Sequence, residues 1–365
     1  MKKTSGALIT LSCLILLSGC WDQNLLKDVQ LIYTAGYDQT DNGEVMATTL
    51  APPIDDTDQV NEITVTGHTM RDSMLQMDHL IDELADFSKL QTIIIGNDLA
   101  AEEIYSFFDE MYRNPQYNLH ARLAVTDRPA NELLSLQLET QKDKSEYFKG
   151  LLESSELTSL SPYVSLQDAC TSIFNPEKDL YLPYISYDEK EKRARLEGIA
   201  LFHKNRFTGV HLNTEESVIF NIINNDTGET VRVTRRVHDD RELEVENWLT
   251  AEIKQSKTRM KVSRDLKTWE AEVEMEIVIT EYGQNKITKE KEEELEKRLK
   301  EILTDDIEQV MAKLQSSQSD TFGLANRISA YNDENWDPDT WDETYKALEV
   351  QAKVEMKVRG TGIID

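Results

Sequence analysis

Residues 269–279 read Trp269-Glu270-Ala271-Glu272-Val273-Glu274-Met275-Glu276-Ile277-Val278-Ile279. Apolar residues occupy every second position, and glutamates fill four of the positions between them. Because successive side chains of a strand point to opposite faces, this pattern predicts a strand with one buried and one solvated face. Residues 348–359 alternate in the same way, with lysines and an arginine on the polar side. If the two strands are neighbours, those cations can pair with the glutamates.

A long amphipathic helix is predicted between these strands, over residues 289–314. Its apolar residues recur mostly at steps of three and four: Leu295, Leu299, Ile302, Leu303, Val310, Met311 and Leu314. Such a helix is about 39 Å long at 1.5 Å per residue, and its apolar stripe should lie across the sheet. A coiled-coil dimer is the alternative, but the spacing does not hold a strict seven-residue repeat.

The first half of the chain mixes strand and helix patterns. Asn42-Gly43 tolerates positive φ and marks a hairpin turn. Apolar spacing predicts helices over residues 70–87 and 99–112. The predicted strands are residues 29–36, 44–50, 63–66, 92–95, 120–125, 180–187 and 195–202. We therefore expect an α+β, multi-domain protein with mixed sheets each covered by helices, in which the C-terminal domain packs its long amphipathic helix on an antiparallel sheet.

The length of the chain implies more than one domain, since 365 residues exceed one ordinary core. The charged run at residues 188–193 is predicted to be an exposed connection. We expect a signal peptide at 1–19, an N-terminal α/β domain at 20–188 and a C-terminal α+β region at 189–365. A further division near residue 225, into a small middle domain and a C-terminal domain, is the alternative.

The N-terminus carries a targeting signal. Lys2 and Lys3 precede an apolar run at residues 7–17, which leads into Leu17-Ser18-Gly19-Cys20. This order is typical of a signal peptide that ends in a lipobox. The run is shorter than the roughly 20 residues that a membrane-spanning helix needs. We predict cleavage before Cys20 and lipidation of Cys20, whose acyl chains then hold the mature protein on the outer face of a membrane. An ordinary secretory signal that happens to end in cysteine is the alternative.

Cysteine use and charge restrict the possible functions. Cys13 lies in the signal segment, so Cys170 is the one cysteine of the mature body apart from Cys20. Neither an internal disulfide nor a thiolate metal site is therefore expected, and helical spacing around Cys170 favours a buried structural thiol. The chain has 40 basic and 68 acidic residues, a net charge of -28. Nucleic acid is a poor partner for such a protein.

The sequence offers little support for catalysis. It has no nucleophile elbow, zinc-protease helix, paired Cys-x-x-Cys or Gly-rich phosphate loop. We therefore assign no catalytic, cofactor-binding or metal-binding residue. A proton relay of His238 with Asp239-Asp240 has only adjacency in its favour. The acidic runs near residues 55–62 and 333–343 are interpreted as solvated loops, with a weak calcium site as the alternative.

Basic residues gather in two segments of this acidic chain. They form a patch that faces a partner or lipid headgroups, or they are solvated side chains of a strand pair, and the sequence favours neither interpretation. The residues are Arg232, Arg235, Arg236, Lys254, Lys257, Arg259, Lys261, Arg264 and Lys267.

Three segments together resemble the GerC family, the lipoprotein C subunits of bacterial spore germinant receptors. The lipobox runs directly into Trp21-Asp22. A central segment reads Glu197-Gly198-Ile199-Ala200-Leu201-Phe202 and is followed by Arg206-Phe207-Thr208-Gly209. A C-terminal block contains Asp320-Thr321-Phe322-Gly323, Asn335-Trp336, Trp341 and Gly360-Thr361-Gly362-Ile363.

The resemblance implies a multi-domain α+β lipoprotein on the outer surface of the inner spore membrane. It further implies action with integral membrane A and B subunits in nutrient-triggered germination. We therefore expect a non-catalytic, lipid-anchored subunit that works through protein contacts. A solute-binding lipoprotein of a transport system and an extracytoplasmic hydrolase are the alternatives. Trp336 and Trp341 fit a role in closing the C-terminal core as well as contact with a partner.

Overall fold

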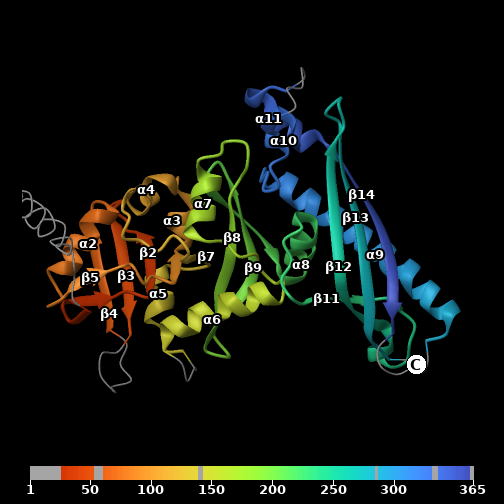
Figure 1. Cartoon of the computed structure of the whole chain (residues 1–365), viewed down its shortest axis with the longest axis horizontal. Helices are drawn as coiled ribbons and strands as arrows, with labels where there is room; N and C mark the ends of the chain where they lie inside the picture. Colours follow the sequence, from red (N-terminus) through yellow and green to blue (C-terminus); the bar gives the residue numbers. More distant parts are fainter. Residues whose placement is uncertain (1–25, 53–60, 139–142, 284–286, 331–335, 362–365) are drawn as a thin grey trace, which may run out of the picture.

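The computed structural model describes residues 26–52, 61–138, 143–283, 287–330 and 336–361. Figure 1 shows an elongated molecule with a large sheet towards one end and a four-stranded sheet towards the other. Helix α8 (Thr214–Asn224) lies between the two sheets. No helix in the described ranges is long and apolar enough to cross a membrane.

The first sheet has eight strands in the order β10-β9-β8-β7-β6-β2-β3-β4. The central strands β8, β7, β6 and β2 are parallel, and the flanking strands join in antiparallel fashion. The strands are β2 (Thr34–Gln39), β3 (Val45–Ala51), β4 (Asn61–Gly67), β6 (Thr92–Ile95), β7 (Arg122–Thr126), β8 (Tyr181–Asp188), β9 (Arg193–His203) and β10 (Arg206–Asn213). A separate parallel pair is formed by β1 (Val29–Leu31) and β5 (Leu84–Asp86).

Helices cover both faces of the first sheet. They are α2 (Met70–Asp78), α3 (Asn97–Ala101), α4 (Tyr105–Arg113), α5 (Ala130–Ser135), α6 (Lys144–Leu157) and α7 (Leu166–Ile173), after a short 3-10 turn η1 (Leu26–Asp28). Ile93 and Ile95 of β6 pack in a core with α2, α3, α4 and α7. Ile94 packs in a second core with α5 and α6. All four residues of β6 are buried, as expected for a parallel strand between two helical layers.

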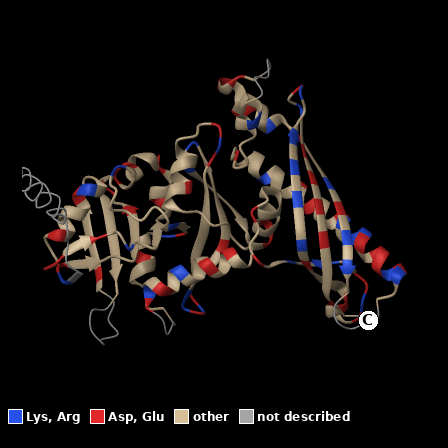
Figure 2. Cartoon of the chain, in the orientation of Figure 1, with Lys and Arg blue, Asp and Glu red and all other residues tan. Residues whose placement is uncertain are grey.

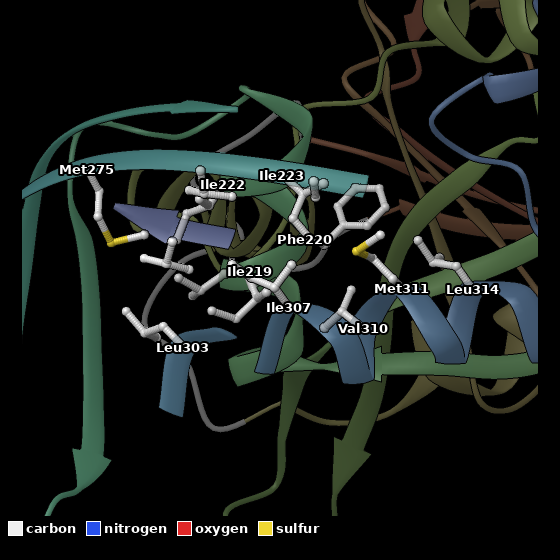
Figure 3. Close-up of a cluster of buried hydrophobic side chains, with 14 of the residues drawn as sticks. Ile219, Phe220, Ile222, Ile223, Met275, Leu303, Ile307, Val310, Met311 and Leu314 are labelled. Atoms are coloured by element: carbon white, nitrogen blue, oxygen red, sulfur yellow. The ribbon is translucent and has the colours of Figure 1, made fainter. Parts of the chain in front are cut away.

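The second sheet has the order β11-β12-β13-β14 and is covered by helices on one face. Its elements are β11 (Val231–Arg236), η2 (Glu244–Asn247), β12 (Trp248–Val262), β13 (Thr268–Tyr282), α9 (Lys289–Ser316), α10 (Leu324–Ala330), η3 (Pro338–Thr340), α11 (Trp341–Ala347) and β14 (Glu349–Gly360). Figure 3 shows Ile219 of α8, Leu303 and Ile307 of α9 and Met275 of β13 in one apolar cluster. The predicted long helix is confirmed, and Thr288 caps its N-terminus.

The α+β fold class is confirmed, but one detail of the C-terminal sheet differs. The sequence predicts an antiparallel sheet, whereas β14 runs parallel to β13, with Glu272 opposite Lys353 and Glu276 opposite Lys357. The 28-residue helix α9 returns the chain to the starting end of β13 before β14 begins. A strand that follows such a crossover runs in the same direction as its neighbour. The predicted pairing of glutamates with cations between the two strands holds, since Arg359 contacts Glu276.

Helix α9 also protects the outer edge of β14. The backbone N–H of Ala352 donates to the Glu308 carboxylate at 3.0 Å. The N–H of Val358 donates to Glu296 at 3.4 Å. Two amides on the free edge of the sheet therefore have acceptors from the neighbouring helix.

Two helices of the first half differ from their predicted lengths. The helix predicted over residues 70–87 ends at Asp78, because the Asp78 carboxylate accepts from the N–H of Ala85 at 3.1 Å and holds a turn. Residues 84–86 then form β5. The helix predicted over 99–112 is two helices, α3 and α4, separated where Glu102 adopts an extended conformation.

The predicted connection at residues 188–193 lies inside the first sheet. It is the turn of the β8–β9 hairpin, with Asp188 opposite Arg193. Its charges are solvated because a hairpin turn is exposed, and the sheet continues to Asn213 at the end of β10. The second sheet begins at Val231 with β11, so the two sheets are separated by residues 214–230, while the domain boundaries at 188 and near 225 stay predictions.

Candidate functional site

The predicted lipidation residue Cys20 lies outside the described residues, as does the signal segment 1–19. Both expectations stay predictions. The described chain begins at η1, and β1 then pairs with β5, with Val29 opposite Leu84. Figure 1 places β5 at one end of the molecule and β11 to β14 at the other. The chain therefore continues towards Cys20 from the end that is remote from the second sheet.

Segments that are far apart in sequence meet between the two sheets, and we call this contact the junction (residues 179, 202–204, 319–320 and 342). The N–H of Asp320 donates to the Asp179 carboxylate at 2.8 Å, and the N–H of Asp179 donates to the Asp320 carbonyl oxygen at 3.1 Å. The Ser319 hydroxyl donates to the Phe202 carbonyl oxygen at 2.6 Å. These bonds attach the segment after α9 to β9 and to the residues that lead into β8 of the first sheet.

Asp320 is the buried carboxylate of the junction. It accepts from the N–H groups of Leu324 and Ala325, each at 2.8 Å, at the start of α10. Burial raises the pKa of Asp320 to about 6, although the two backbone donors oppose the shift. Both carboxylate oxygens thus serve as acceptors for the chain itself, which is a positioning role.

His203 is the junction's titratable ring. Its Nδ1 lies 3.5 Å from the Asp179 carboxylate, and its Nε2 lies 3.6 Å from Asp342 of α11. Lys204 also contacts Asp342. The Asp179 carboxylate raises the pKa of His203 above its ordinary value, against the effect of burial and of Lys204. A protonated His203 would therefore bridge carboxylates from two parts of the fold.

The aromatic residues of the C-terminal block close the core beside the junction. Phe322 stacks on Phe220 of α8 with ring centres 4.9 Å apart, and meets the edge of Trp269 at 6.0 Å. Trp341 is buried, and its ring centre lies 5.2 Å from that of the half-buried Trp336. Both tryptophans thus pack into this core, which supports the first of the two roles expected for them.

The basic residues from the sequence lie mainly on the open face of the second sheet. Figure 2 shows cations along β12 beside glutamates along β13. Arg259 pairs with Glu274 at 2.6 Å and Lys261 with Glu272 at 3.0 Å. Arg235 is different, because it points to the helical side and pairs with Asp306 of α9 at 2.6 Å. The open face is therefore a ladder of ion pairs accessible to solvent.

The proton relay around His238 does not form in the structure. The His238 ring lies 2.9 Å from the Tyr282 hydroxyl, while Asp239 and Asp240 pair with neighbouring arginines. Cys170 is partly buried, and burial raises the pKa of its thiol, which lowers its reactivity. Among the residues described, no three His, Cys, Asp or Glu side chains are grouped so as to hold a metal ion.

A groove between the β12–β13 turn and α10 was not anticipated from the sequence. It has a volume of about 620 Å³, and its lining includes the apolar residues Met260, Leu266 and Ile328 and the cationic residues Lys261 and Arg327. A shallower hollow of about 680 Å³ lies over β12, β13 and β14. Neither the groove nor the hollow can be predicted from the periodicity of apolar residues, because each forms between elements that are distant in sequence.

Comparisons with known proteins agree with this architecture. Residues 22–187 match a family described as the spore germination protein N-terminal domain, and residues 197–362 match the C-terminal domain of the spore germination B3/GerAC-like family. The two matches meet at the β8–β9 hairpin. The spore germination protein GerQC of Bacillus cereus is 20% identical over 96% of this chain and 97% of its own length.

Two further relatives come from Bacillus subtilis (strain 168). They are a putative spore germination protein, YfkR, and the spore germination protein KC, each 22% identical over all of this chain and over 98% and 97% of their own lengths. The crystal structure of the GerBC protein superposes with a TM-score of 0.58 at 17% identity, covering 89% of this chain and 96% of that one. The fold is thus shared with GerBC, and the chain belongs to the GerC family of spore germination proteins, the C subunits of germinant receptors.

Proposed function

We propose that the chain is a non-catalytic, lipid-anchored subunit of a germinant receptor, held on the outer face of the cytoplasmic (inner spore) membrane. It acts through contacts with integral membrane A and B subunits and is required for nutrient-triggered germination. The observation that carries the proposal is the lipobox ending at Cys20, two residues before the family match begins at residue 22. Acyl chains at Cys20 would confine the body beside membrane neighbours and raise its effective concentration there, so that weak contacts suffice.

Replacement of the lipidated residue tests this proposal. Cys20→Ala should abolish incorporation of radioactive palmitate and sharply reduce germination of spores that carry the variant. Cys170→Ser is the matched control, since it removes the other cysteine of the mature chain and should leave labelling and germination intact. Normal germination with an unlabelled, soluble Cys20→Ala protein would refute the anchoring mechanism.

The groove beside α10 supports a second candidate, a solute-binding lipoprotein of a transport system. Apolar residues together with Lys261 and Arg327 suit a small anionic solute with an apolar part. Such a solute should raise the unfolding temperature of the mature protein in proportion to its concentration, and Arg327→Ala should weaken that effect. A panel of small carboxylates without any thermal shift would remove this candidate.

A further inference from the structure

Exposed leucines gather near the end of the molecule that leads to Cys20. Leu80 is 68% exposed and Leu84 is 53% exposed, and Leu75 of the preceding helix is 47% exposed. Single exposed apolar side chains are ordinary, but three within ten residues call for a partner or an apolar surface. Leu80 and Leu84 lie on the segment between α2 and the end of β5, which we call the α2–β5 loop (residues 79–86).

The α2–β5 loop is held in place by defined contacts. The N–H of Leu80 donates to the Met77 carbonyl oxygen at 2.8 Å. The Asp78 carboxylate accepts from Ala85, and the partly buried Ile81 packs against the core of the first sheet. The two leucines are therefore presented by an ordered segment that keeps them in solvent.

The distance along the chain ties this loop to the predicted anchor. Val29 pairs directly with Leu84, and Val29 follows Cys20 by nine residues. Nine fully extended residues span at most about 30 Å. An acylated Cys20 at a bilayer surface therefore keeps Val29 within that distance of the lipid, and the backbone of its strand partner Leu84 no more than about 5 Å further away.

We propose that Leu80 and Leu84 insert into the headgroup region of the membrane and so orient the body upon it. The inference rests on the proposed lipid anchoring at Cys20 and adds the surface that meets the lipid. Asp82 and Glu83 lie between the two leucines, and ionised carboxylates are costly in hydrocarbon. They limit the insertion to the interfacial layer, where apolar side chains gain from burial while carboxylates stay hydrated.

The orientation that follows places the first sheet near the membrane and the second sheet away from it. Figure 1 shows β5 and β11 to β14 at opposite ends of the long axis. The open, charged face of β12 to β14 would then be available to protein rather than to lipid. A lipid surface accounts for both the exposed leucines and their closeness to Cys20, whereas a protein partner accounts for the leucines alone.

A site-specific fluorophore tests the contact. The acylated protein with Cys170→Ser receives one new cysteine, Leu80→Cys or Leu84→Cys, labelled with the environment-sensitive dye NBD and placed on phosphatidylcholine vesicles. Leu243→Cys is the matched control, because Leu243 is 61% exposed but lies beside η2 in the region of the second sheet. Nitroxide attached near the top of the acyl chains should quench the dye at position 80 or 84 about twofold or more, and should leave position 243 unquenched.

The outcomes separate this inference from the proposed anchoring. If the protein floats with the vesicles and positions 80 and 84 are quenched no more than 243, the lipid contact is refuted and the anchoring stands. If the protein does not float with the vesicles at all, the anchoring itself fails. Dye emission that shifts without vesicles, in step with protein concentration, would show that a second copy covers the leucines and would overturn the inference.

Discussion

The strands β6 and β13 show how differently the two halves of this protein are built. β6 lies between two helical layers and buries all four of its residues. In β13 every second residue from Trp269 to Ile279 is apolar and buried, and the glutamates between them are half-buried or exposed on the open face. A sheet with helices on both faces has no face exposed to solvent, whereas a sheet covered on one face exposes the other. The difference indicates that the second sheet is the one built to present a surface.

The largest expected effect comes from neighbouring residues of β6. Ile93→Ala and Ile94→Ala should each lower the free energy of unfolding by about 2–5 kcal/mol, since each opens a cavity in a different core. The matched pair in β13 should behave unequally: Val273→Ala destabilises the protein, and Glu274→Ala leaves its stability nearly unchanged. Urea denaturation of the purified mature chain measures all four. Equal losses at Val273 and Glu274 would contradict the one-sided burial of the second sheet.

The junction between the halves should give the next largest effect, and it depends on pH. Because the pKa of Asp320 is raised to about 6 in the folded protein, the folded state holds this proton more firmly than the unfolded state does. The contribution of Asp320 to stability is therefore complete below the ordinary pKa of aspartate and is lost as pH rises through about 6, by on the order of 3 kcal/mol. Asp320→Asn should flatten this slope in a series of unfolding measurements from pH 3.5 to 9.

His203 provides the control for that series. Its pKa is also raised, so its contribution is complete below the ordinary histidine value of about 6.5 and is lost as pH rises through the folded value. His203→Gln should flatten the curve above pH 6.5 and leave the Asp320 slope at lower pH in place. If substitution of one residue changes the slope of stability with pH both below pH 6 and above pH 6.5, the two groups titrate as one coupled system.

The smallest expected effect compares ion pairs on the two sides of the second sheet. Asp306→Ala removes the shorter of the two ion pairs of the partly buried Arg235, whose side chain is 12% exposed and keeps Glu215 at 3.3 Å, and should cost about 1–3 kcal/mol. Glu272→Ala removes the partner of Lys261 on the open face, and its smaller effect should disappear in high salt. Unfolding of both variants at low and high salt checks this contrast. A large, salt-independent loss at Glu272 would mean that the open face is structural.

The second half of the fold was easier to predict from sequence than the first, for a physical reason. A strand that is buried on one face has alternating apolar and polar residues, as in residues 269–279. Helix α9 has a stripe of apolar residues at helical spacing. The run Thr92–Ile95 also identifies a buried strand, but continuous apolar residues do not tell which strands flank it. The spacing of Leu80 and Leu84 fits the stripe that begins at Met70, although both are exposed beyond the end of α2.

Pairing direction and long-range contacts were beyond the reach of sequence patterns. Alternation in residues 348–359 is the same for a parallel and an antiparallel strand, so the direction of β14 follows only from the length and packing of α9. The junction joins Asp179 to Asp320, and nothing in the local sequence of either relates the two. Residues 320–323 belong to the C-terminal block that resembles the GerC family, and in the structure Asp320 and Phe322 contact elements of both halves.

The carboxylates of Glu296 and Glu308, which accept from N–H groups on the free edge of β14, affect how copies of the protein meet when they are crowded. Lipid-anchored molecules share a two-dimensional layer, where collisions between copies are frequent. An edge strand with free N–H and C=O groups could then pair with a strand of another copy. Here α9 already occupies two of the donors that an incoming chain would require. Under the proposed anchoring at Cys20, copies that meet at the membrane would find fewer free donors along β14 for pairing with another strand.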